Sequence, residues 1–317
     1  MIWTVDVGDE PPATEFPRYR DLVVTLNSTL PDVPLYLNLN PNYGRVVENT
    51  EKQIIEQLGV ETYRQYIDSY CEIVPLNYIS YDFYPYIEGE AQASLLSKMY
   101  DNFIIVSEAC RKTGRAFWYI PQLNSRPGQS PLSVNKLRFQ ANAALSFGAT
   151  RITWGCWSRG WWDNNVLDEN GCQTGQYAKL KEVNLGLRGI ESEYMRFRNV
   201  ETHFVGFAAY AQYAPNMPIN KINVLDVGSF SGVRASNGAS ILVGEMVARD
   251  GSRANALYIT AADDPLDEHN AIFNILFKAR NIQAFGSKGK IEVRNLPDGS
   301  CAVPISSCEG VLLVADN

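Results

Sequence analysis

Short runs of alternating hydrophobic and polar residues take turns with longer amphipathic stretches along the first 198 residues. Alternation with a period of two predicts a strand, and hydrophobic positions three and four residues apart predict a helix. The predicted strands are Ile2–Val7, Leu35–Leu39, Tyr78–Phe83, Ala116–Ile120 and Arg151–Trp157. The predicted helices lie near 15–29, 51–73, 91–113, 131–147 and 173–197. This alternation is typical of parallel strands with crossover helices, an α/β arrangement.

The end of each predicted strand carries a polar or aromatic residue, and these residues follow one another at intervals of 30 to 42 residues. They are Glu10, Asn40, Asp82, Gln122 and Trp157. Such spacing is typical of a TIM-type (β/α) barrel, although a doubly wound sheet gives a similar interval. Two features favour the barrel: no glycine-rich phosphate loop follows a predicted strand, and every strand end offers a side chain suited to a shared site.

The predicted strands make up five βα units, whereas a closed barrel needs eight. We therefore expect residues 1–198 to be the C-terminal five units of a barrel, a catalytic domain that lacks about 120 residues. The alternative is a different architecture, but an open five-stranded remnant would expose its edges. Met1 is followed at once by a strand pattern, so no signal peptide is expected. Localisation stays open, with a secreted or periplasmic protein slightly favoured.

The pattern of hydrophobic and polar residues changes after residue 199. Helical periodicity fades there, and short alternating runs are separated by Gly, Asn, Asp and Ser. This pattern predicts a second domain over 199–317, an antiparallel β-sandwich. The segment Ile272–Lys278 is hydrophobic without a clear period, so its structure is ambiguous.

Composition narrows the function. The formal net charge is −7 and basic residues form no run, so nucleic acid is not expected as a partner. No hydrophobic stretch has the length that a membrane span needs.

The two His and six Cys form no zinc-binding motif. Cys301 and Cys308 are either a disulfide across a hairpin or free buried thiols. Aromatic residues make up 11% of the chain, which fits either a ring-rich core or a cleft in which rings stack on sugars.

Carboxylates end two of the predicted strands. Asp9, Glu10 and Pro11 end the first, and the proline stops that strand. Alternation along Tyr78–Phe83 puts Asp82 on the same face as Tyr84, which follows the strand. Cleavage of a glycosidic bond needs a protonated carboxyl group beside the leaving oxygen, so both acids are candidates for catalysis. The alternatives are a solvated turn for Asp9 and Glu10, and an Asp82 that only orients a neighbour.

Amides and indoles at the other strand ends are candidates for holding a sugar. Amide side chains donate to and accept from hydroxyl groups, and indole rings provide flat stacking surfaces. The candidates for substrate binding are Asp9, Asn38, Asn40, Tyr84, Gln122, Trp154, Trp157 and Trp161.

Gly8-Asp9-Glu10-Pro11 resembles the fourth-strand motif of the glycoside-hydrolase clan that includes the β-galactosidase-like barrels. In that clan the Glu before Pro is the acid/base, which implies this role for Glu10. Residues 79–85 resemble a sixth strand of related glycosidases, and residues 137–149 are similar to the helix before their eighth strand. The resemblance covers roughly residues 1–198 and implies strands four to eight of the barrel.

One position departs from this pattern, because the clan's nucleophile is a Glu that ends strand seven and Gln122 stands there. Three explanations are open. Asp82 is the nucleophile; or Glu10 is the acid and Asp82 the base of an inverting enzyme; or Gln122 marks an inactive site. A carboxyl separation of about 5–5.5 Å indicates retention, and roughly 6.5–9.5 Å indicates inversion.

The function expected from these residues is hydrolysis of a neutral, β-galactoside-like oligosaccharide or polysaccharide, with Glu10 and Asp82 as catalytic residues and no metal or cofactor. The rival functions are a carbohydrate-binding protein without hydrolysis and an inactive truncated glycosidase. The sugar, the linkage and the oligomeric state are not predicted.

Overall fold

The computed structural model describes residues 4–42, 51–89, 92–155, 157, 162–206 and 222–315. The chain divides into two compact units. The first contains Met1–Pro85, Leu95–Ile120 and Ala149–Thr153, and the second contains Tyr86–Ser94, Pro121–Gly148 and Trp154–Asn317. Among the described helices, none is long and apolar enough to cross a membrane.

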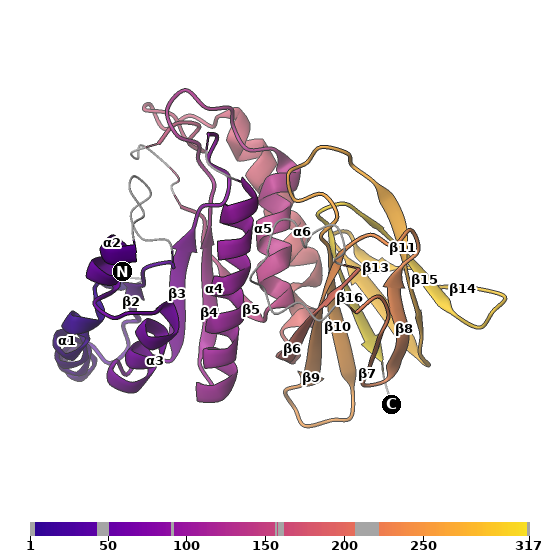
Figure 1. Ribbon diagram of the computed structural model, residues 1–317, viewed down its shortest axis with the longest axis horizontal. Helices are drawn as coiled ribbons and strands as arrows, with labels where there is room; N and C mark the ends of the chain where they lie inside the picture. Colours follow the sequence, from indigo (N-terminus) through magenta and orange to yellow (C-terminus); the bar gives the residue numbers. More distant parts are fainter. Residues whose placement is uncertain are drawn as a thin grey trace. The chain divides into compact units, whose positions relative to one another are not determined.

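The first unit alternates strands and helices (Figure 1). Its strands are β1 (Val5–Asp9), β2 (Leu35–Asn38), β3 (Tyr78–Phe83), β4 (Ala116–Pro121) and β5 (Ala149–Ile152). Its helices are η1 (Ala13–Glu15), α1 (Phe16–Thr29), α2 (Glu51–Leu58), α3 (Tyr63–Ile73) and α4 (Gln92–Thr113).

The strands of the first unit neighbour one another in chain order. β1 pairs with β2 in parallel, a parallel bridge joins Leu39 to Tyr81 of β3, and β3, β4 and β5 form one sheet. Sequential order is the order of a (β/α) barrel, whereas a doubly wound sheet places its first strand in the interior. Within the described residues no pairing joins β5 to β1, so these strands form an open array.

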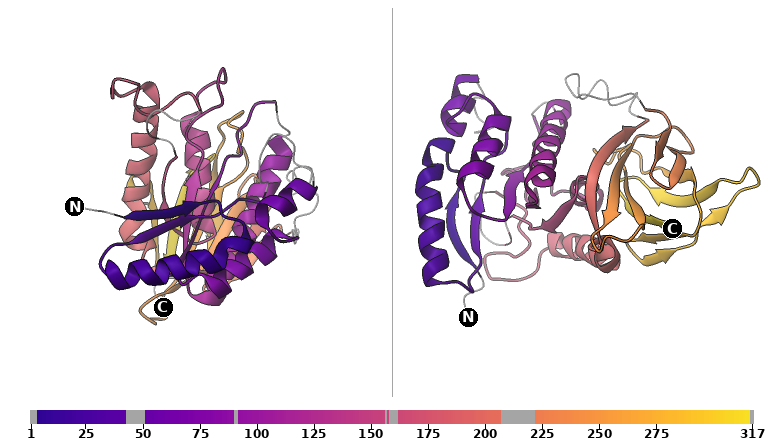
Figure 2. Two further views of the ribbon diagram at one scale, coloured as in Figure 1. Left: turned by 90° about the vertical axis from the view of Figure 1, so that its left-hand side faces the viewer. Right: turned by 90° about the horizontal axis from the view of Figure 1, so that it is seen from below.

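Helices cover the hydrophobic face of this array. Phe103 of α4 packs edge-on against Phe117 and Tyr119 of β4. Helix α1 lies alongside β1 and β2 in both views of Figure 2. Its Phe16 is fully buried and packs against Tyr66 of α3. These contacts fix the strand ends at which the candidate residues lie.

The opposite face of the array carries aromatic and polar side chains. The rings of Tyr78 and Trp118 stack with their centroids 3.7 Å apart, and Tyr36 lies at 6.2 Å from each. The guanidinium of Arg151 lies 3.9 Å from the Trp118 ring centroid, a cation–π contact. This face leads to the carboxyl ends of β1, β2 and β3.

In the described part of the second unit there are two helices and the remaining strands. They are α5 (Val134–Ser146), α6 (Gly175–Tyr194), β6 (Phe197–Val205), β7 (Leu225–Val227), β8 (Phe230–Ala235), β9 (Ile241–Ala248), β10 (Asn255–Ala261), β11 (Ile272–Lys278), β12 (Ile282–Gly286), β13 (Gly289–Ile291), β14 (Arg294–Asn295), β15 (Cys301–Ser306) and β16 (Gly310–Ala315).

These strands form a six-stranded sheet in the order β13-β12-β16-β10-β9-β6 and a five-stranded array in the order β14-β15-β11-β8-β7. Their strand pairs are antiparallel, and buried side chains of both sheets belong to one hydrophobic core. Helix α5 packs on β9 and β10 (Figure 1). A Cβ atom at Gly244 of β9 would collide with the Ser146 carbonyl oxygen at the end of α5, so this contact needs glycine.

The compact units do not follow the boundary predicted between residues 198 and 199. The β-only part of the chain does begin near it, at β6, but α5 and α6 belong to the second unit because they pack on its strands. The predicted boundary therefore stays a division by type of secondary structure. Cys301 and Cys308 are free and buried, so the second of the two alternatives for them is found.

Candidate active site

Glu10 follows β1 in a backbone conformation that is unusual for its residue type. Its φ is +47°, in the left-handed region. Its N–H donates to the carbonyl oxygen of Asn38 over 3.0 Å, and its own carbonyl accepts from the Asn40 amide over 2.8 Å. Left-handed backbone at a non-glycine residue costs about 1–3 kcal/mol and is concentrated at functional sites. Two bonds from β2 and its end therefore fix where the Glu10 side chain begins.

Asn38, the last residue of β2, joins two carboxylates. Its amide nitrogen donates to Asp82 Oδ1 over 2.7 Å and to Asp9 Oδ1 over 3.2 Å. Asp82 lies on β3 and is buried, whereas Asp9 ends β1 and is exposed. One amide thus holds carboxylates from both neighbouring strands, which brings three of the predicted residues together.

The surroundings of Asp82 favour its protonated form. Burial raises the pKa of its carboxyl group from 3.8 to about 6, the hydrogen bond from Asn38 opposes this rise, and the negative charge of Asp9 adds to it. A hydrogen bond from the Tyr84 side chain also lowers this pKa. A carboxyl group with a pKa near 6 exchanges a proton within the pH range in which enzymes work.

Asn40 is fully buried, and both the nitrogen and the oxygen of its side-chain amide form hydrogen bonds within the protein. Its nitrogen donates to the Glu10 carbonyl, and its oxygen accepts from Gln57 over 2.7 Å. The Tyr66 hydroxyl donates to the Pro11 carbonyl over 2.7 Å next to it. Through these bonds Asn40 holds the Glu10 backbone, and its contact with a sugar stays a prediction.

Two further residues support the carboxylates, and neither was among the predicted site residues. The hydroxyl groups of Tyr36 and Ser80 lie 2.8 Å apart, and Ser80 donates to the Asn38 amide oxygen over 3.4 Å. Both precede a site residue by two positions, Tyr36 before Asn38 and Ser80 before Asp82. Alternation along the strands was therefore the signal that predicts their place below the carboxylates.

The pKa of Asp82 gives a first prediction. In the folded protein the Asp82 carboxyl group titrates near pH 6, as carbon-13 NMR of labelled aspartate will measure. Asp9→Asn lowers this pKa because it removes a neighbouring negative charge, and Asn38→Ala raises it because it removes the hydrogen bond to the carboxylate. Since the folded-state pKa is raised, the linked stability is present at low pH and is lost as pH rises through about 6. Equal pKa values in all three proteins would contradict the arrangement.

Gln122 belongs to the second unit and is fully buried. Its amide nitrogen donates to the carbonyls of Tyr86 and Asn124 over 2.8 and 2.9 Å, and its amide oxygen accepts from the Tyr86 N–H over 2.7 Å. Both donors of the amide are thus used within the protein, which leaves none for a sugar hydroxyl. The side chain holds the loop that follows β4.

The predicted tryptophans have different environments. Trp154 is 6% exposed and donates its indole N–H to Asn184 of α6 over 2.9 Å, so it packs within the second unit. Trp157 is 47% exposed and lines a hollow of about 370 Å³ together with Tyr177 and other residues of α6. An exposed ring beside a hollow is suited to stacking on a sugar. Trp161 lies outside the described residues.

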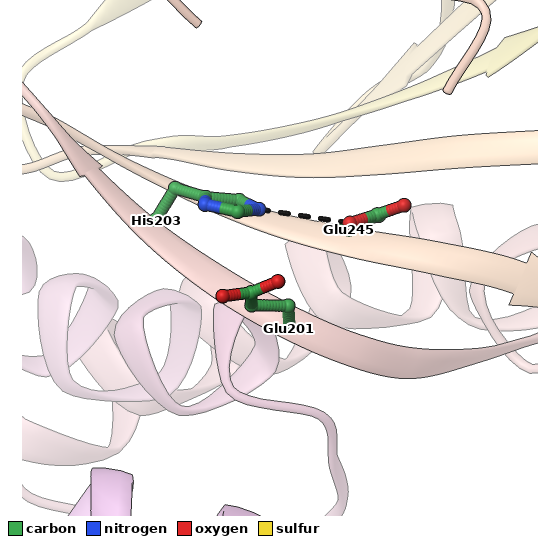
Figure 3. A group of neighbouring side chains, drawn as sticks. All are labelled: Glu201, His203 and Glu245. Carbon is green, nitrogen blue, oxygen red and sulfur yellow. Dashed lines mark ion pairs between the residues drawn. The ribbon is translucent and has the colours of Figure 1, made fainter. Parts of the chain in front are cut away.

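Among the described residues, one group of side chains has the composition of a metal site. Glu201 and His203 of β6 and Glu245 of β9 present ligand atoms that all lie within 4.8 Å of one another (Figure 3). The group belongs to the second unit and contains none of the predicted site residues.

The sequence matches no protein-family model and no curated protein. Among solved structures, the chain is similar to a GH30 endoxylanase from Clostridium papyrosolvens C71, with 9% identity, a TM-score of 0.39, and coverage of 99% of this chain and 66% of that chain. It is similar to a family 51 alpha-L-arabinofuranosidase from Bifidobacterium longum, with 9% identity, a TM-score of 0.38, and coverage of 98% and 66%. It is also similar to a beta-galactosidase from Marinomonas ef1, with 14% identity, a TM-score of 0.36, and coverage of 58% and 29%.

These structural neighbours are glycoside hydrolases, and the chain spans less than two-thirds of the length of each. Likenesses with TM-scores from 0.36 to 0.39 bear on neither the substrate nor the reaction of this chain. Any function has to be supported by the side chains.

Proposed function

We propose that this chain hydrolyses glycosidic bonds with the carboxyl groups at the ends of β1 and β3. The observation that carries the proposal is the Asn38 amide, which donates to the carboxylates of Asp9 and Asp82. Glycoside hydrolysis needs a pair of carboxyl groups in different protonation states beside one bond. The strands that flank β2 supply acidic groups in different environments, Asp9 exposed on β1 and Asp82 buried on β3 with a raised pKa, and this difference supports the proposal.

Glu10 is the proton donor of the proposed reaction and Asp82 is its base or nucleophile. At neutral pH a carboxyl group with a pKa of about 6 is mostly ionised, so Asp82 is ready to accept a proton or to attack the anomeric carbon. The Asn38 amide orients the Asp82 carboxylate through its hydrogen bond. The bonds from Asn38 and Asn40 to the Glu10 backbone fix the origin of the donor side chain.

The substrate of the proposal is a neutral oligosaccharide or polysaccharide, and by sequence resemblance a β-galactoside. Asp9 is exposed beside Asp82, and its carboxylate is placed to accept from sugar hydroxyl groups. Tyr84 is partly exposed at the end of β3 and already hydrogen-bonds to Asp82. These two residues are the proposed substrate contacts of the first unit.

The test is a panel of nitrophenyl glycosides and neutral polysaccharides, incubated with the purified chain between pH 5 and 7. We expect release of nitrophenol or of reducing ends from at least one β-glycoside. NMR of the first product anomer then distinguishes retention from inversion, which correspond to carboxyl separations of about 5–5.5 Å and roughly 6.5–9.5 Å. Absence of turnover on every substrate would overturn the proposal.

A second candidate function is carbohydrate binding without hydrolysis. The observation that favours it is the exposed Trp157 ring beside the hollow on α6, which lies in the second unit. Calorimetry with the same polysaccharides separates the two functions. Binding that Trp157→Ala abolishes, in a protein without turnover, would support the second function and exclude the first.

A further inference from the structure

From the geometry of β6 and β9 we infer a binding site for a divalent transition-metal ion, with Zn²⁺ as its model ion, formed by Glu201, His203 and Glu245. The three side chains lie on one face of the six-stranded sheet, at its β6 edge. Figure 3 shows the imidazole of His203 and both carboxylates gathered over the two strands. This site is independent of the proposed hydrolytic site.

Strand pairing creates the site. Glu201 lies directly opposite Glu245 in the antiparallel ladder, and His203 follows Glu201 by two positions on the same face. A register shift between Asn199 and Glu201 precedes the pair. Bulges of this kind redirect side chains and are common near functional sites. Without this shift, Glu201 and His203 would lie on the other face of β6, away from Glu245.

In this arrangement two carboxylates face each other, and one imidazole nitrogen has no hydrogen-bond partner. Like charges directly opposite each other on neighbouring strands destabilise a sheet, and Glu201 and Glu245 are such a pair. His203 Nε2 is buried and has no hydrogen-bond partner, and it lies 3.6 Å from Glu245 Oε2. A cation between these atoms bonds to the imidazole nitrogen and balances both carboxylates, so it satisfies all three groups at once.

The position in the sheet gives the site both a rigid and an open side. Val205 of β6 is 1% exposed in the core, the His203 side chain is 14% exposed, and Glu201 is exposed, so burial decreases outward along the strand. The opposite face of β6 is held by hydrogen bonds from Asn199 and Thr202 to the Ser146 carbonyl of α5. A rigid imidazole at the core boundary and a solvent-exposed carboxylate form a preorganised site with an entry path.

The donor set selects the class of ion. Imidazole nitrogen is a ligand of Zn²⁺, Cu²⁺, Ni²⁺ and Fe²⁺, whereas Ca²⁺ and Mg²⁺ take oxygen ligands. Three protein ligands and a water molecule complete a tetrahedral zinc site. In such a site the ligand atoms lie about 3.3 Å apart, since each lies about 2.0–2.1 Å from the metal. The ligand atoms here lie within 4.8 Å, and rotation of the exposed Glu201 side chain closes the difference.

This site was not expected from the sequence. Zinc motifs have closely spaced ligands, whereas Glu245 is 42 residues beyond His203 in the chain. Only the pairing of β6 with β9 brings the third ligand to the other two.

The test is titration of the chelator-treated, full-length chain with ZnCl₂, followed by calorimetry. We expect one saturable Zn²⁺ per chain and a Tm that rises with zinc concentration. His203→Gln and Glu245→Gln each weaken binding by at least tenfold. The matched control is His269→Gln, because His269 is the other histidine of the chain, is exposed and also neighbours a glutamate. This control leaves zinc binding unchanged.

Nitrogen-15 NMR of the two histidines provides a readout that needs no variant. We expect Zn²⁺ to shift the Nε2 signal of His203 and to leave the His269 ring unchanged. Absence of saturable binding by the wild-type chain would overturn the inference. So would binding that survives His203→Gln, or zinc-induced shifts that affect both histidines equally.

Discussion

Asp82→Asn is expected to lower kcat/KM on any glycoside that the protein hydrolyses by about 10²–10⁴-fold, the usual contribution of a general acid or base. The substitution leaves the size of the side chain and the neighbouring Asn38 unchanged. It removes the carboxylate that accepts the proton or attacks the sugar. Initial rates on the same substrate measure the effect. We expect the loss to be similar for good and poor leaving groups, because the base or nucleophile does not protonate the leaving oxygen.

Asp101→Asn is the matched control for this experiment. Asp101 lies on α4 of the same unit, and partial burial raises the pKa of its carboxyl group as well. It is not at the end of a strand, so its replacement leaves kcat/KM unchanged. Comparable losses in both variants would mean that buried aspartates support the fold, and the assignment of Asp82 would then be wrong.

Glu10→Gln has the second large expected effect, and its signature differs. A proton donor matters most for a leaving group that is a poor anion. We therefore expect a loss of about 10²–10⁴-fold on alkyl glycosides and natural oligosaccharides, and a much smaller loss on dinitrophenyl glycosides. The measurement is kcat/KM against leaving-group pKa for the wild type and the variant, with the variant giving the steeper dependence.

Glu15→Gln controls for a change of charge near the end of β1. Glu15 lies in η1 of the same unit, and it forms an exposed ion pair with Arg18. Exposed pairs of this kind contribute little, so activity stays at the wild-type level. If Glu10→Gln lowered all rates by one common factor, Glu10 would position the site and would not donate the proton.

The order and type of elements in the first unit could be predicted because periodicity and burial agree there. Tyr78–Phe83 is a strand with the predicted ends. The predicted helix over 51–73 is two helices, α2 and α3. Gly59, with a φ of +72°, ends the first, and Thr62 caps the second because its hydroxyl oxygen accepts from the Gln65 N–H. Thr62 with Gln65 three positions later forms a capping box, which accounts for the start of a second helix within the predicted one.

Other differences come from partners that a linear pattern does not contain. The last predicted strand of the first domain, Arg151–Trp157, is displaced, because β5 occupies Ala149–Ile152 and pairs with β4. Aromatic enrichment at residues 154–157 resembled a strand, yet Gly155 makes only an isolated bridge to Gln122. The ambiguous segment 272–278 is a strand, β11, whose neighbours β15 and β8 lie on either side. Burial does alternate along β11, with Phe273, Ile275 and Phe277 buried, but Ile272 and Leu276 on the other face are hydrophobic too, so the sequence shows no clear period.

The strand β15 contains Pro304, a residue type that argues against an interior strand. The partner strand β14 pairs only with Cys301 and Ala302. Within the described residues, Pro304 therefore has no strand partner on the β14 side of β15. Because no hydrogen bond is formed on that side, the N–H that proline lacks is not missed there. The proline follows the rule for edge positions, but the short β14 that creates this edge was not predictable.

The candidate site was predictable in its residue types and not in its connections. Strand ends identified Asp9, Glu10, Asn38, Asn40 and Asp82 because carboxyl ends of neighbouring parallel strands meet. The sequence did not indicate which amide bridges the carboxylates or which positions a backbone, since these roles depend on hydrogen bonds between residues tens of positions apart. Gln122 shows the same limit, because its amide bonds to the protein.

The pH dependence of kcat/KM tests the central claim most directly, because it connects the titration of the Asp82 carboxyl group to turnover. The proposed mechanism predicts a rate that rises with pH through about 6, the pKa of Asp82, and a rise that moves to lower pH in Asp9→Asn by the same amount as the pKa measured by NMR. A rise that does not move in Asp9→Asn while the NMR pKa does would contradict the mechanism.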